Sequence, residues 1–317
     1  MRLILMGTGP FAVPSFEALR DAGHEIALVV TKPQPAVRSR KGPPPAPVRT
    51  WAESAELPIF DPVSINDPES VDHIAAVGAK LMVVCDYGQI LKPAALAASR
   101  LGGINLHGSL LPAYRGAAPV QRSLLSGDET TGVSVIHMTP RLDGGPIITT
   151  RETRISDQET AGELEERLSQ IGIEATLQAI EKLADWDERS PIGQPQDPSR
   201  VSKAPRLSKA EAEIDWSRTS RQIDCHVRGM QPWPVAFTHI TPPSAKQPIR
   251  LAIKQVKPLK ITPPDAVPGE IIEGDGLCVA TGDSAIEITR LQPAGKREMD
   301  ASDFTRGHAL PPGTRFH

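Results

Sequence analysis

Two polar side chains, Asn105 and His107, stand at the end of an apolar strand pattern in the stretch INLHGSLLPAYRGAAPVQ. Because side chains alternate along a strand, both are expected on one face, with Leu106 on the other. An amide donates a hydrogen bond to an oxygen that gains charge, and an imidazole exchanges protons near neutral pH. The pair therefore indicates a site that handles charge and protons, while two side chains that only cap a strand end remain the alternative.

A carboxylate, Asp143, follows the next predicted strand, in the stretch MTPRLDGGPI. We expect it in a loop at the carboxyl end of that strand, where a sharp turn through Gly144 and Gly145 holds it near the sheet edge and close to His107. There it would orient the imidazole and increase its basicity; an ordinary turn Asp bonded to its own backbone is the alternative. An Asn, a His and an Asp at one edge are what acyl transfer to an amine requires. Since no Ser or Cys stands as a nucleophile, the pattern favours direct transfer.

The elements that position these side chains alternate between strand and helix through the first half of the chain. Helical patterns such as residues 11–23 and 68–78 separate short apolar runs. This order predicts an α/β fold with a Rossmann-like, doubly wound, mostly parallel sheet, on which ligands bind beyond the carboxyl ends of the strands. The predicted strands are residues 2–6, 25–30, 57–60, 80–85, 103–107 and 132–138.

The second half of the chain has a different pattern. A helical apolar periodicity over residues 160–186 closes the first domain. The next 19 residues are polar with four prolines, which is typical of a linker, and the short strand patterns after them predict a small β-barrel or sandwich. We therefore divide the chain into a catalytic domain at 1–186, a linker at 187–205 and a C-terminal domain at 206–317.

The composition bounds the class of protein. The 317 residues suffice for about two domains. Cys85, Cys225 and Cys278 show no paired spacing, which fits a reducing cytoplasm. The N-terminal apolar run ends at Met6 and no run of about 18 apolar residues follows, so we expect neither a signal peptide nor a membrane span. No histidine has metal-ligand spacing, and we expect no metal.

Two basic clusters lie far apart in the sequence, at residues 32–49 and 250–260. In the second, Arg250 and Lys254 share one face of a predicted strand, while the apolar residues between them pack inward. Such clusters are usually solvated surface, but two of them on separate domains could hold a phosphate backbone electrostatically. The basic residues of the first cluster are Lys32, Arg38, Arg40, Lys41 and Arg49.

The stretch VVCDYGQIL, residues 83–91, combines the end of the fourth predicted strand with an apolar turn. A planar ring ligand could lie against Ile90 and Leu91 and bind backbone groups near Tyr87 and Gly88. A plain buried strand end is an equally good interpretation of this stretch alone.

These residues stand in motifs that resemble the methionyl-tRNA formyltransferases, within the superfamily of formyltransferases that use 10-formyltetrahydrofolate. The resemblance runs nearly end to end; its central block is shared by the whole superfamily, whereas the C-terminal motifs favour the enzymes that act on tRNA. The motifs are GTGPFAVPSFEAL, VVCDYGQIL, GINLHGSLLPAYRGAAPVQRSLLSGDETTGVSVIHM and LDGG in the first domain, and LSKAEAEIDWS, IDCHVRGMQPWPVAF and LQPAGKREM in the second.

The resemblance implies transfer of a formyl group from 10-formyltetrahydrofolate to the α-amine of methionyl initiator tRNA, for translation initiation in the cytoplasm. It implies that Asn105 holds the formyl oxygen as it becomes an oxyanion, while His107 and Asp143 steer removal of the amine proton. It also implies an OB-like C-terminal barrel that binds tRNA together with a basic loop formed by the cluster at residues 32–49. We expect the protein to be a monomer. The implied folate contacts are Ser109, Leu110, Leu111, Pro112, Tyr87, Gly88, Ile90 and Leu91, and the implied tRNA contacts are Arg38, Arg40, Lys41, Arg250 and Lys254.

The sequence departs from the family pattern at two places beside the implied site. Around the catalytic Asp the family reads Gly-Leu-Asp-Thr-Gly-Asp, whereas this chain reads Arg-Leu-Asp-Gly-Gly-Pro over residues 141–146, which changes the expected loop conformation. Asp86 stands where the family commonly has Ala, which makes the adjoining pocket more polar.

Other activities account for fewer of these features. A formyltransferase that acts on an amino-sugar nucleotide would share the three implied catalytic residues but leave both basic clusters without a role. Glycinamide ribonucleotide formyltransferase resembles only the first domain. The alternative of a nicotinamide-dependent oxidoreductase is supported only by the motif GTGPFA, residues 7–12. Pro10 removes a backbone amide that a phosphate would need, and the second predicted strand does not end in an acidic residue that could bind a ribose hydroxyl. A non-catalytic RNA-binding module leaves the Asn, His and Asp unexplained.

Overall fold

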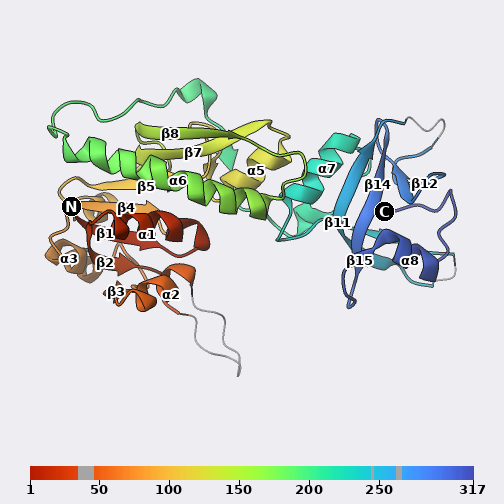
Figure 1. Ribbon diagram of the computed structural model, residues 1–317, viewed down its shortest axis with the longest axis horizontal. Helices are drawn as coiled ribbons and strands as arrows, with labels where there is room; N and C mark the ends of the chain where they lie inside the picture. Colours follow the sequence, from red (N-terminus) through yellow and green to blue (C-terminus); the bar gives the residue numbers. More distant parts are fainter. Residues whose placement is uncertain (35–45, 244–245, 262–265) are drawn as a thin grey trace. The chain divides into compact units, whose positions relative to one another are not determined.

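A computed structural model describes residues 1–34, 46–243, 246–261 and 266–317 (Figure 1). The chain forms two compact units. The first comprises Met1–Pro119, Thr130–Arg154 and Leu164–Pro205, and the second comprises Val120–Glu129, Ile155–Glu163 and Arg206–His317. Most of helix α5 (Pro119–Leu125) therefore belongs to the second unit, although it precedes two strands of the first.

The first unit is built on a seven-stranded sheet of order β3-β2-β1-β4-β5-β7-β8. Its first five strands are parallel, whereas β7 and β8 are antiparallel to their neighbours. The predicted doubly wound, mostly parallel fold is confirmed. The strands are β1 (Arg2–Gly7), β2 (Glu25–Val30), β3 (Ile59–Phe60), β4 (Leu81–Cys85), β5 (Gly103–His107), β7 (Thr130–His137) and β8 (Ile147–Arg154).

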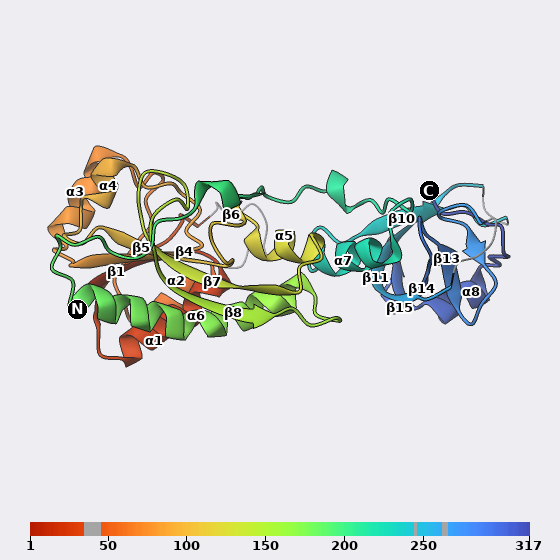
Figure 2. The same ribbon diagram turned by 90° about the horizontal axis from the view of Figure 1, so that it is seen from above.

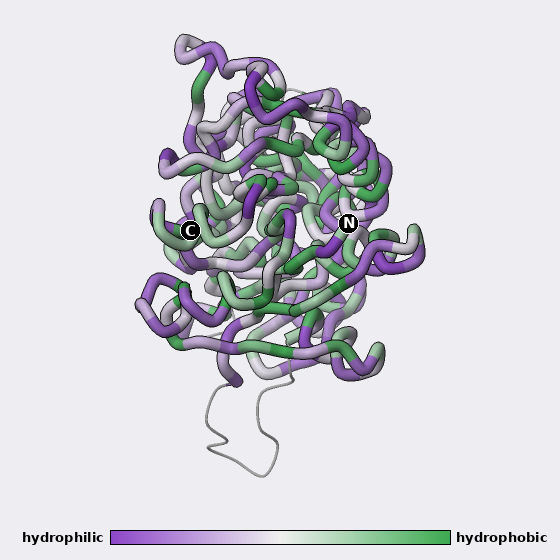
Figure 3. The backbone as a smooth tube through the Cα atoms, turned by 90° about the vertical axis from the view of Figure 1, so that its left-hand side faces the viewer, coloured by the Kyte–Doolittle hydropathy of each residue, from purple (hydrophilic) through white to green (hydrophobic). Residues whose placement is uncertain are grey.

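Helices cover both faces of this sheet. Figure 2 shows α1 (Val13–Asp21) and α6 (Ala161–Ala184) along one face, with α3 (Pro68–Ala76) and α4 (Pro93–Leu96) on the other. A Cβ on Gly172 of α6 would lie 2.8 Å from the Leu106 side chain, so the glycine allows α6 to lie close to β5. On the opposite face, alternate residues of β1 and β4 form an apolar core with α3 and α4, and in Figure 3 polar stretches follow many of the outer loops.

The second unit contains an antiparallel sheet of order β10-β11-β14-β13-β12, with β15 paired to β14. The sheet is curled into an open half-barrel of the OB-like type, and β11 carries register shifts around Gln255 that increase its curvature. The elements are α7 (Ser220–Gly229), β10 (Phe237–Ile240), β11 (Ile249–Leu259), β12 (Ile271–Ile272), β13 (Leu277–Ala280), β14 (Ala285–Pro293), β15 (Met299–Asp300) and α8 (Ala301–Gly307), with the short helix η3 (Ala210–Ala212) before them.

Residues 187–205, the polar stretch with four prolines, belong to the first unit and form backbone hydrogen bonds with two of its other segments. Gln194 exchanges backbone hydrogen bonds of 2.8 Å with Ile147, at the start of β8. Further on, β9 (Lys203–Ala204) pairs in parallel with β6 (Arg115–Gly116), beyond the short helix η2 (Pro198–Arg200). This stretch thus carries regular backbone contacts.

Helix α2 (Pro47–Ser54) begins at the end of the basic stretch of residues 32–49 and includes its last basic residue, Arg49. Its Arg49 is only 9% exposed and forms an ion pair with Asp61. The interpretation of Arg49 as part of an exposed basic loop is therefore wrong, because its side chain is buried within the first unit and its guanidinium pairs with the exposed Asp61 carboxylate.

No helix in the part of the chain that the structure describes is both long and apolar enough to cross a membrane.

The buried His226 imidazole in α7 is expected to make the stability of the second unit depend on pH. It is 8% exposed, it bonds the backbone of Ala212, and its Nε2 has no hydrogen-bond partner among the described residues. Burial lowers the pKa of His226 below its usual value of about 6.5. The unfolded chain therefore takes up the proton first, so stability is complete above about pH 6.5 and falls as the pH drops towards the folded pKa.

We expect His226→Asn to remove part of this pH dependence, because an amide can keep the bond to Ala212 and cannot be protonated. The measurement is the free energy of unfolding by denaturant between pH 7 and pH 5. The exposed His73→Asn serves as the control and should keep the parent's slope. A slope in His226→Asn equal to that of the parent would contradict the prediction.

Candidate active site

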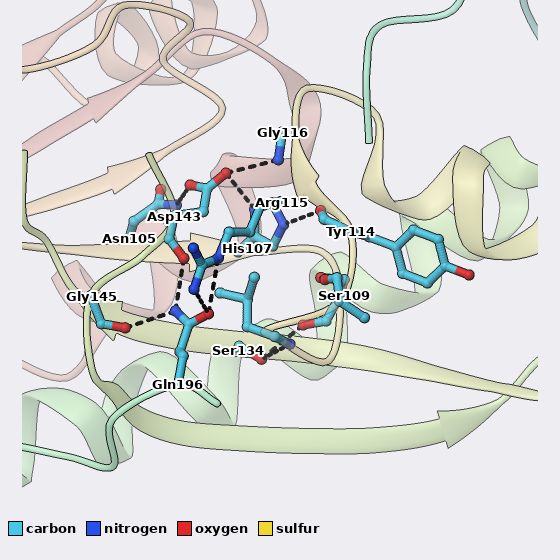
Figure 4. A network of polar contacts seen from close by, with 12 residues as sticks. Asn105, His107, Ser109, Tyr114, Arg115, Gly116, Ser134, Asp143, Gly145 and Gln196 are labelled. Atoms are coloured by element: carbon cyan, nitrogen blue, oxygen red, sulfur yellow. Dashed lines mark hydrogen bonds and ion pairs between the residues drawn. The ribbon is translucent and has the colours of Figure 1, made fainter. Parts of the chain in front are cut away.

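The structure brings the three predicted polar residues together (Figure 4). Asn105 Nδ2 lies 3.5 Å from Asp143 Oδ1, and His107 Nδ1 lies 3.9 Å from Asp143 Oδ2. Asn105 and His107 extend from the same face of β5, as the alternation predicted, while Leu106 packs towards α6 on the opposite face. The His107 side chain is 6% exposed and that of Asp143 is 12% exposed, so both polar groups are largely shielded from solvent.

Asp143 reaches this position from the loop that follows β7. Since β7 runs antiparallel to β5, its last residue, His137, pairs with Ile104 near the start of β5. Asp143 nevertheless lies in the loop after β7 and close to His107, as predicted. The loop of residues 138–146 folds back so that Asp143 meets the end of β5.

The turn that holds Asp143 depends on two special positions. Asp143 itself has φ +46°, in the left-handed region that Asp tolerates better than most residues. A Cβ on Gly145 would lie 1.8 Å from the carbonyl oxygen of His137, so only glycine fits there. Gly144 is less constrained, because its Cβ would meet only the Arg141 side chain.

The hydrogen bonds of His107 fix which ring nitrogen is basic. Nε2 lies 2.9 Å from the carbonyl oxygen of Tyr114, which can only accept, so Nε2 carries the proton. In the neutral ring the lone pair is therefore on Nδ1, which faces Asp143. The Asp143 carboxylate is oriented in turn by the Gly116 N–H, which donates to Oδ2 over 2.9 Å.

The arrangement combines one hydrogen-bond donor with two proton acceptors. The Asn105 amide can donate to an oxygen that gains negative charge, while His107 Nδ1 and the Asp143 carboxylate can both accept a proton. The distance of 3.9 Å between His107 Nδ1 and Asp143 Oδ2 is too long for a hydrogen bond, so both atoms can accept a proton from a substrate. These are the groups required for addition of an amine to a carbonyl.

Sequence reasoning did not identify Gln196 and Arg115 as parts of this site. The Gln196 amide donates to the carbonyl oxygens of Asp143 and Gly145, and it accepts from the Arg115 guanidinium. Gln196 stands in the stretch that was interpreted as a linker, and no periodicity or motif marks a single glutamine there. Only the tertiary contact identifies it.

The segment after β4 exposes backbone and buries its largest side chain. Tyr87 is 1% exposed, within the apolar core of β1, β4, α3 and α4, and burial raises the pKa of its hydroxyl to about 12. Leu91 is also buried, whereas Gly88 and Ile90 are exposed. A ligand beside this segment would therefore meet the backbone around Gly88 and the Ile90 side chain rather than the tyrosine ring.

The segment Ser109–Pro112 is held by internal hydrogen bonds. Ser109 Oγ donates to the carbonyl oxygen of Ala113 over 2.7 Å, and Ser134 Oγ donates to the carbonyl oxygen of Ser109 over 2.8 Å. Ser109, Leu111 and Pro112 are buried, and Leu110 is partly exposed. Most of these side chains therefore shape the loop and leave little surface for a ligand.

The loop at GTGPFA is occupied by a carboxylate. A Cβ on Gly9 would lie 1.8 Å from Asp86 Oδ2, so the glycine makes room for the Asp86 side chain. A negative charge at this position disfavours a phosphate group, which removes the main support for a dinucleotide site here.

The predicted tRNA contacts fall in two groups. Arg38, Arg40 and Lys41 lie outside the described residues. On β11, Arg250 is exposed with its guanidinium 4.0 Å from the centre of the Phe237 ring, and Lys254 is partly exposed. The intervening Leu251 and Ile253 are fully buried, so the two cations share the outer face of the strand.

The fold and the site define a group-transfer enzyme, and comparisons with known proteins give its class. The first half matches the formyl transferase family over residues 1–180, and residues 206–309 match the formyl transferase C-terminal domain. The chain belongs to the formyl transferase family, and the resemblance inferred from the motifs is confirmed.

Curated relatives cover the whole chain. A protein named methionyl-tRNA formyltransferase from Rhodopirellula baltica is 61% identical over 323 residues, covering 100% of this chain and 96% of the relative. A protein of the same name from Parvibaculum lavamentivorans is 39% identical and covers 99% of each chain.

Solved structures share the fold at low sequence identity. The N-formyltransferase from Helicobacter canadensis, in complex with folinic acid and dTDP-3-aminofucose, has a TM-score of 0.66 and 14% identity, covering 90% of this chain and 97% of its own. Glycinamide ribonucleotide transformylase 1 from Symbiobacterium toebii has a TM-score of 0.50 and 20% identity, covering 62% of this chain and 94% of its own. These likenesses establish the architecture alone.

The turn that holds Asp143 yields a prediction about its two glycines. We expect Gly145→Ala to lower the free energy of unfolding by about 1–3 kcal/mol, because the new methyl group meets a backbone carbonyl that cannot move away cheaply. Gly144→Ala should cost less, because the exposed Arg141 side chain can move. Denaturant unfolding of both variants makes the comparison, and equal losses would contradict this account of the turn.

Proposed function

We propose that the protein transfers the formyl group of 10-formyltetrahydrofolate to the α-amino group of methionyl initiator tRNA. The observation that carries this is the convergence of Asn105, His107 and Asp143 in a chain that is 61% identical over its full length to a protein named methionyl-tRNA formyltransferase. The product is N-formylmethionyl-tRNA, which serves translation initiation. On this proposal the enzyme acts in the cytoplasm, as a monomer.

In the proposed reaction, the methionyl amine attacks the formyl carbon directly, while the formyl group is still bonded to the folate. The formyl oxygen becomes an oxyanion and accepts a hydrogen bond from Asn105 Nδ2. The amine proton passes to His107 Nδ1, beside the Asp143 carboxylate that stabilises the resulting imidazolium. As the tetrahedral carbon collapses, the bond to the folate nitrogen breaks, and that nitrogen takes up the proton from the His107 imidazolium, which returns to the neutral form. Atoms and charges balance without a covalent enzyme intermediate.

We place the folate between the segment after β4 and the segment after β5. The first supplies Tyr87, Gly88, Ile90 and Leu91, and the second supplies Ser109, Leu110, Leu111 and Pro112. The exposed backbone at Gly88 can pair with the polar edge of a planar ring, and the exposed Ile90 can cover its face. The buried members of both segments hold this backbone in position.

We propose that the tRNA is bound electrostatically by Arg38, Arg40 and Lys41 in the first unit and by Arg250 and Lys254 in the second. Cations on an outer strand face suit a phosphate backbone, because phosphate contacts require charge and no particular base. The cation of Arg250 is held over the Phe237 ring, which limits its freedom before binding.

The proposed acceptor is tested by offering several amines to the parent protein. With 10-formyltetrahydrofolate as donor, we expect formylation of methionyl initiator tRNA at a kcat/KM at least about 100-fold above that for an amino-sugar nucleotide or glycinamide ribonucleotide, because only the tRNA engages the basic surface. Transfer to the amino-sugar nucleotide without transfer to the tRNA would contradict the proposal and favour that activity instead.

The proposed tRNA contacts on β11 are tested by the salt dependence of binding. Arg250→Gln and Lys254→Gln should each weaken tRNA binding and reduce the slope of log K against log salt by about 0.7–0.9, the change expected for one lost phosphate contact. Arg306→Gln removes an exposed charge elsewhere in the same unit and should leave the slope unchanged. A slope unaffected by all three substitutions would exclude this strand from the tRNA surface.

A further inference from the structure

The side-chain amide of Gln196 forms hydrogen bonds through both its nitrogen and its oxygen, with the turn at Asp143 and with Arg115 (Figure 4). Nε2 donates to the carbonyl oxygens of Asp143 and Gly145, each over 2.7 Å. Oε1 accepts from the Arg115 guanidinium, from Nε over 3.1 Å and from Nη2 over 2.7 Å. Two N–H groups and two lone pairs are the full capacity of an amide, so every polar group of this side chain is engaged.

The Asp143 turn needs such support. A left-handed conformation is unfavourable for a residue with a Cβ, even for an Asp, so surrounding contacts must maintain it. Among the hydrogen bonds within the loop, Gly144 N–H donates to the carbonyl oxygen of Arg141 over 3.0 Å. The Gln196 amide joins the carbonyls on both sides of Gly144, and thereby fixes the direction of the peptide that follows Asp143.

The oxygen end of the Gln196 amide binds Arg115, the residue immediately before Gly116, whose N–H donates to the Asp143 carboxylate. Arg115 is bound through its side chain to Gln196, and the next residue, Gly116, donates its N–H to Asp143 Oδ2 over 2.9 Å. Gln196 therefore connects the backbone of the Asp143 turn to the segment that orients the Asp143 carboxylate. A glutamate there would retain an acceptor for Arg115 but would direct oxygen at two carbonyl oxygens.

The backbone that presents Gln196 is anchored on both sides. Before it, Gln194 exchanges two backbone hydrogen bonds with Ile147. After it, Asp197 accepts from the Ser199 N–H at the start of η2, and the carbonyl oxygen of Ser202 accepts from the Arg115 N–H over 2.9 Å. A side chain on a backbone held in this way can impose a geometry on its partners.

We propose that Gln196 is a positioning residue for formyl transfer, which sets the Asp143 carboxylate against His107 without touching the substrate. The inference rests on the proposed function, in which Asp143 stabilises the protonated His107.

The first test compares Gln196→Glu with Gln194→Glu, which makes the same charge change on an exposed side chain two residues away. We expect Gln196→Glu to lower kcat about 10- to 100-fold, as for a small misplacement of a reacting group. The KM for the folate donor and for methionyl-tRNA should stay within about twofold, as should all parameters of Gln194→Glu. A kcat unchanged in Gln196→Glu, or an equal loss in both variants, would overturn the proposal.

The second test asks whether Gln196 acts through Asp143. If it does, Gln196→Glu should lower kcat less than about twofold in an Asp143→Asn background, because the group that it positions has already been lost. A further loss as large as in the parent would mean that Gln196 acts by another route, and would overturn the proposal. A general loss of folding would not give this dependence on the background.

The third test does not need activity. The Gly116 N–H is bonded to the Asp143 carboxylate, so its hydrogen exchange, resolved by NMR, reports where that carboxylate lies. We expect faster exchange in Gln196→Glu than in Gln194→Glu, and equal rates would overturn the proposal. If the parent failed to formylate methionyl-tRNA, the proposed function would fall, while this exchange rate would still decide whether Gln196 positions Asp143.

Discussion

A single carboxylate, held almost out of water, is the constraint on which the rest of the site depends. Asp143 is 12% exposed, and a charge in that position has to be compensated by hydrogen bonds. The Gly116 N–H supplies one, the Asn105 amide lies at 3.5 Å, and the His107 imidazole faces the other side of the carboxylate. The left-handed turn, the glycine at 145 and the pairing of β6 with β9 all serve to deliver these groups to the same point.

The two faces of β5 have different roles: one packs against a helix, and the other carries the polar side chains of the site. On one face of β5, Leu106 packs against α6, where Gly172 allows a close approach. On the other face, Asn105 and His107 extend into the site, and the loop of residues 138–146 covers them. The change from parallel to antiparallel strands occurs next to β5, so the connections on either side of it meet at this strand. In the segments after β4 and β5, the side chains of Tyr87, Leu91, Ser109 and Leu111 are buried, whereas the backbone at Gly88 is exposed.

The sequence alone predicts the parts of this arrangement that follow from local pattern. Strand alternation placed Asn105 and His107 on one face, and the alternation of strands and helices predicted the doubly wound sheet. The direction of β7 was not predictable, because it depends on tertiary pairing and on the path of a loop. Arg49 was misassigned because composition does not reveal that its side chain is buried and forms an ion pair with Asp61. Gln196 could not be identified, since one glutamine in a polar, proline-rich stretch carries no period and no motif.

The most direct measurement is the single-turnover rate of formyl transfer to methionyl initiator tRNA by Asp143→Asn, with the folate donor and the tRNA both saturating. The substitution keeps an oxygen for the Gly116 N–H, removes the charge and replaces the other carboxylate oxygen by an amino group. The account predicts a loss of about 100-fold or more in the rate, with folate affinity and folding retained. A rate equal to that of the parent would contradict it, because the carboxylate around which the site is built would then contribute nothing to the transfer.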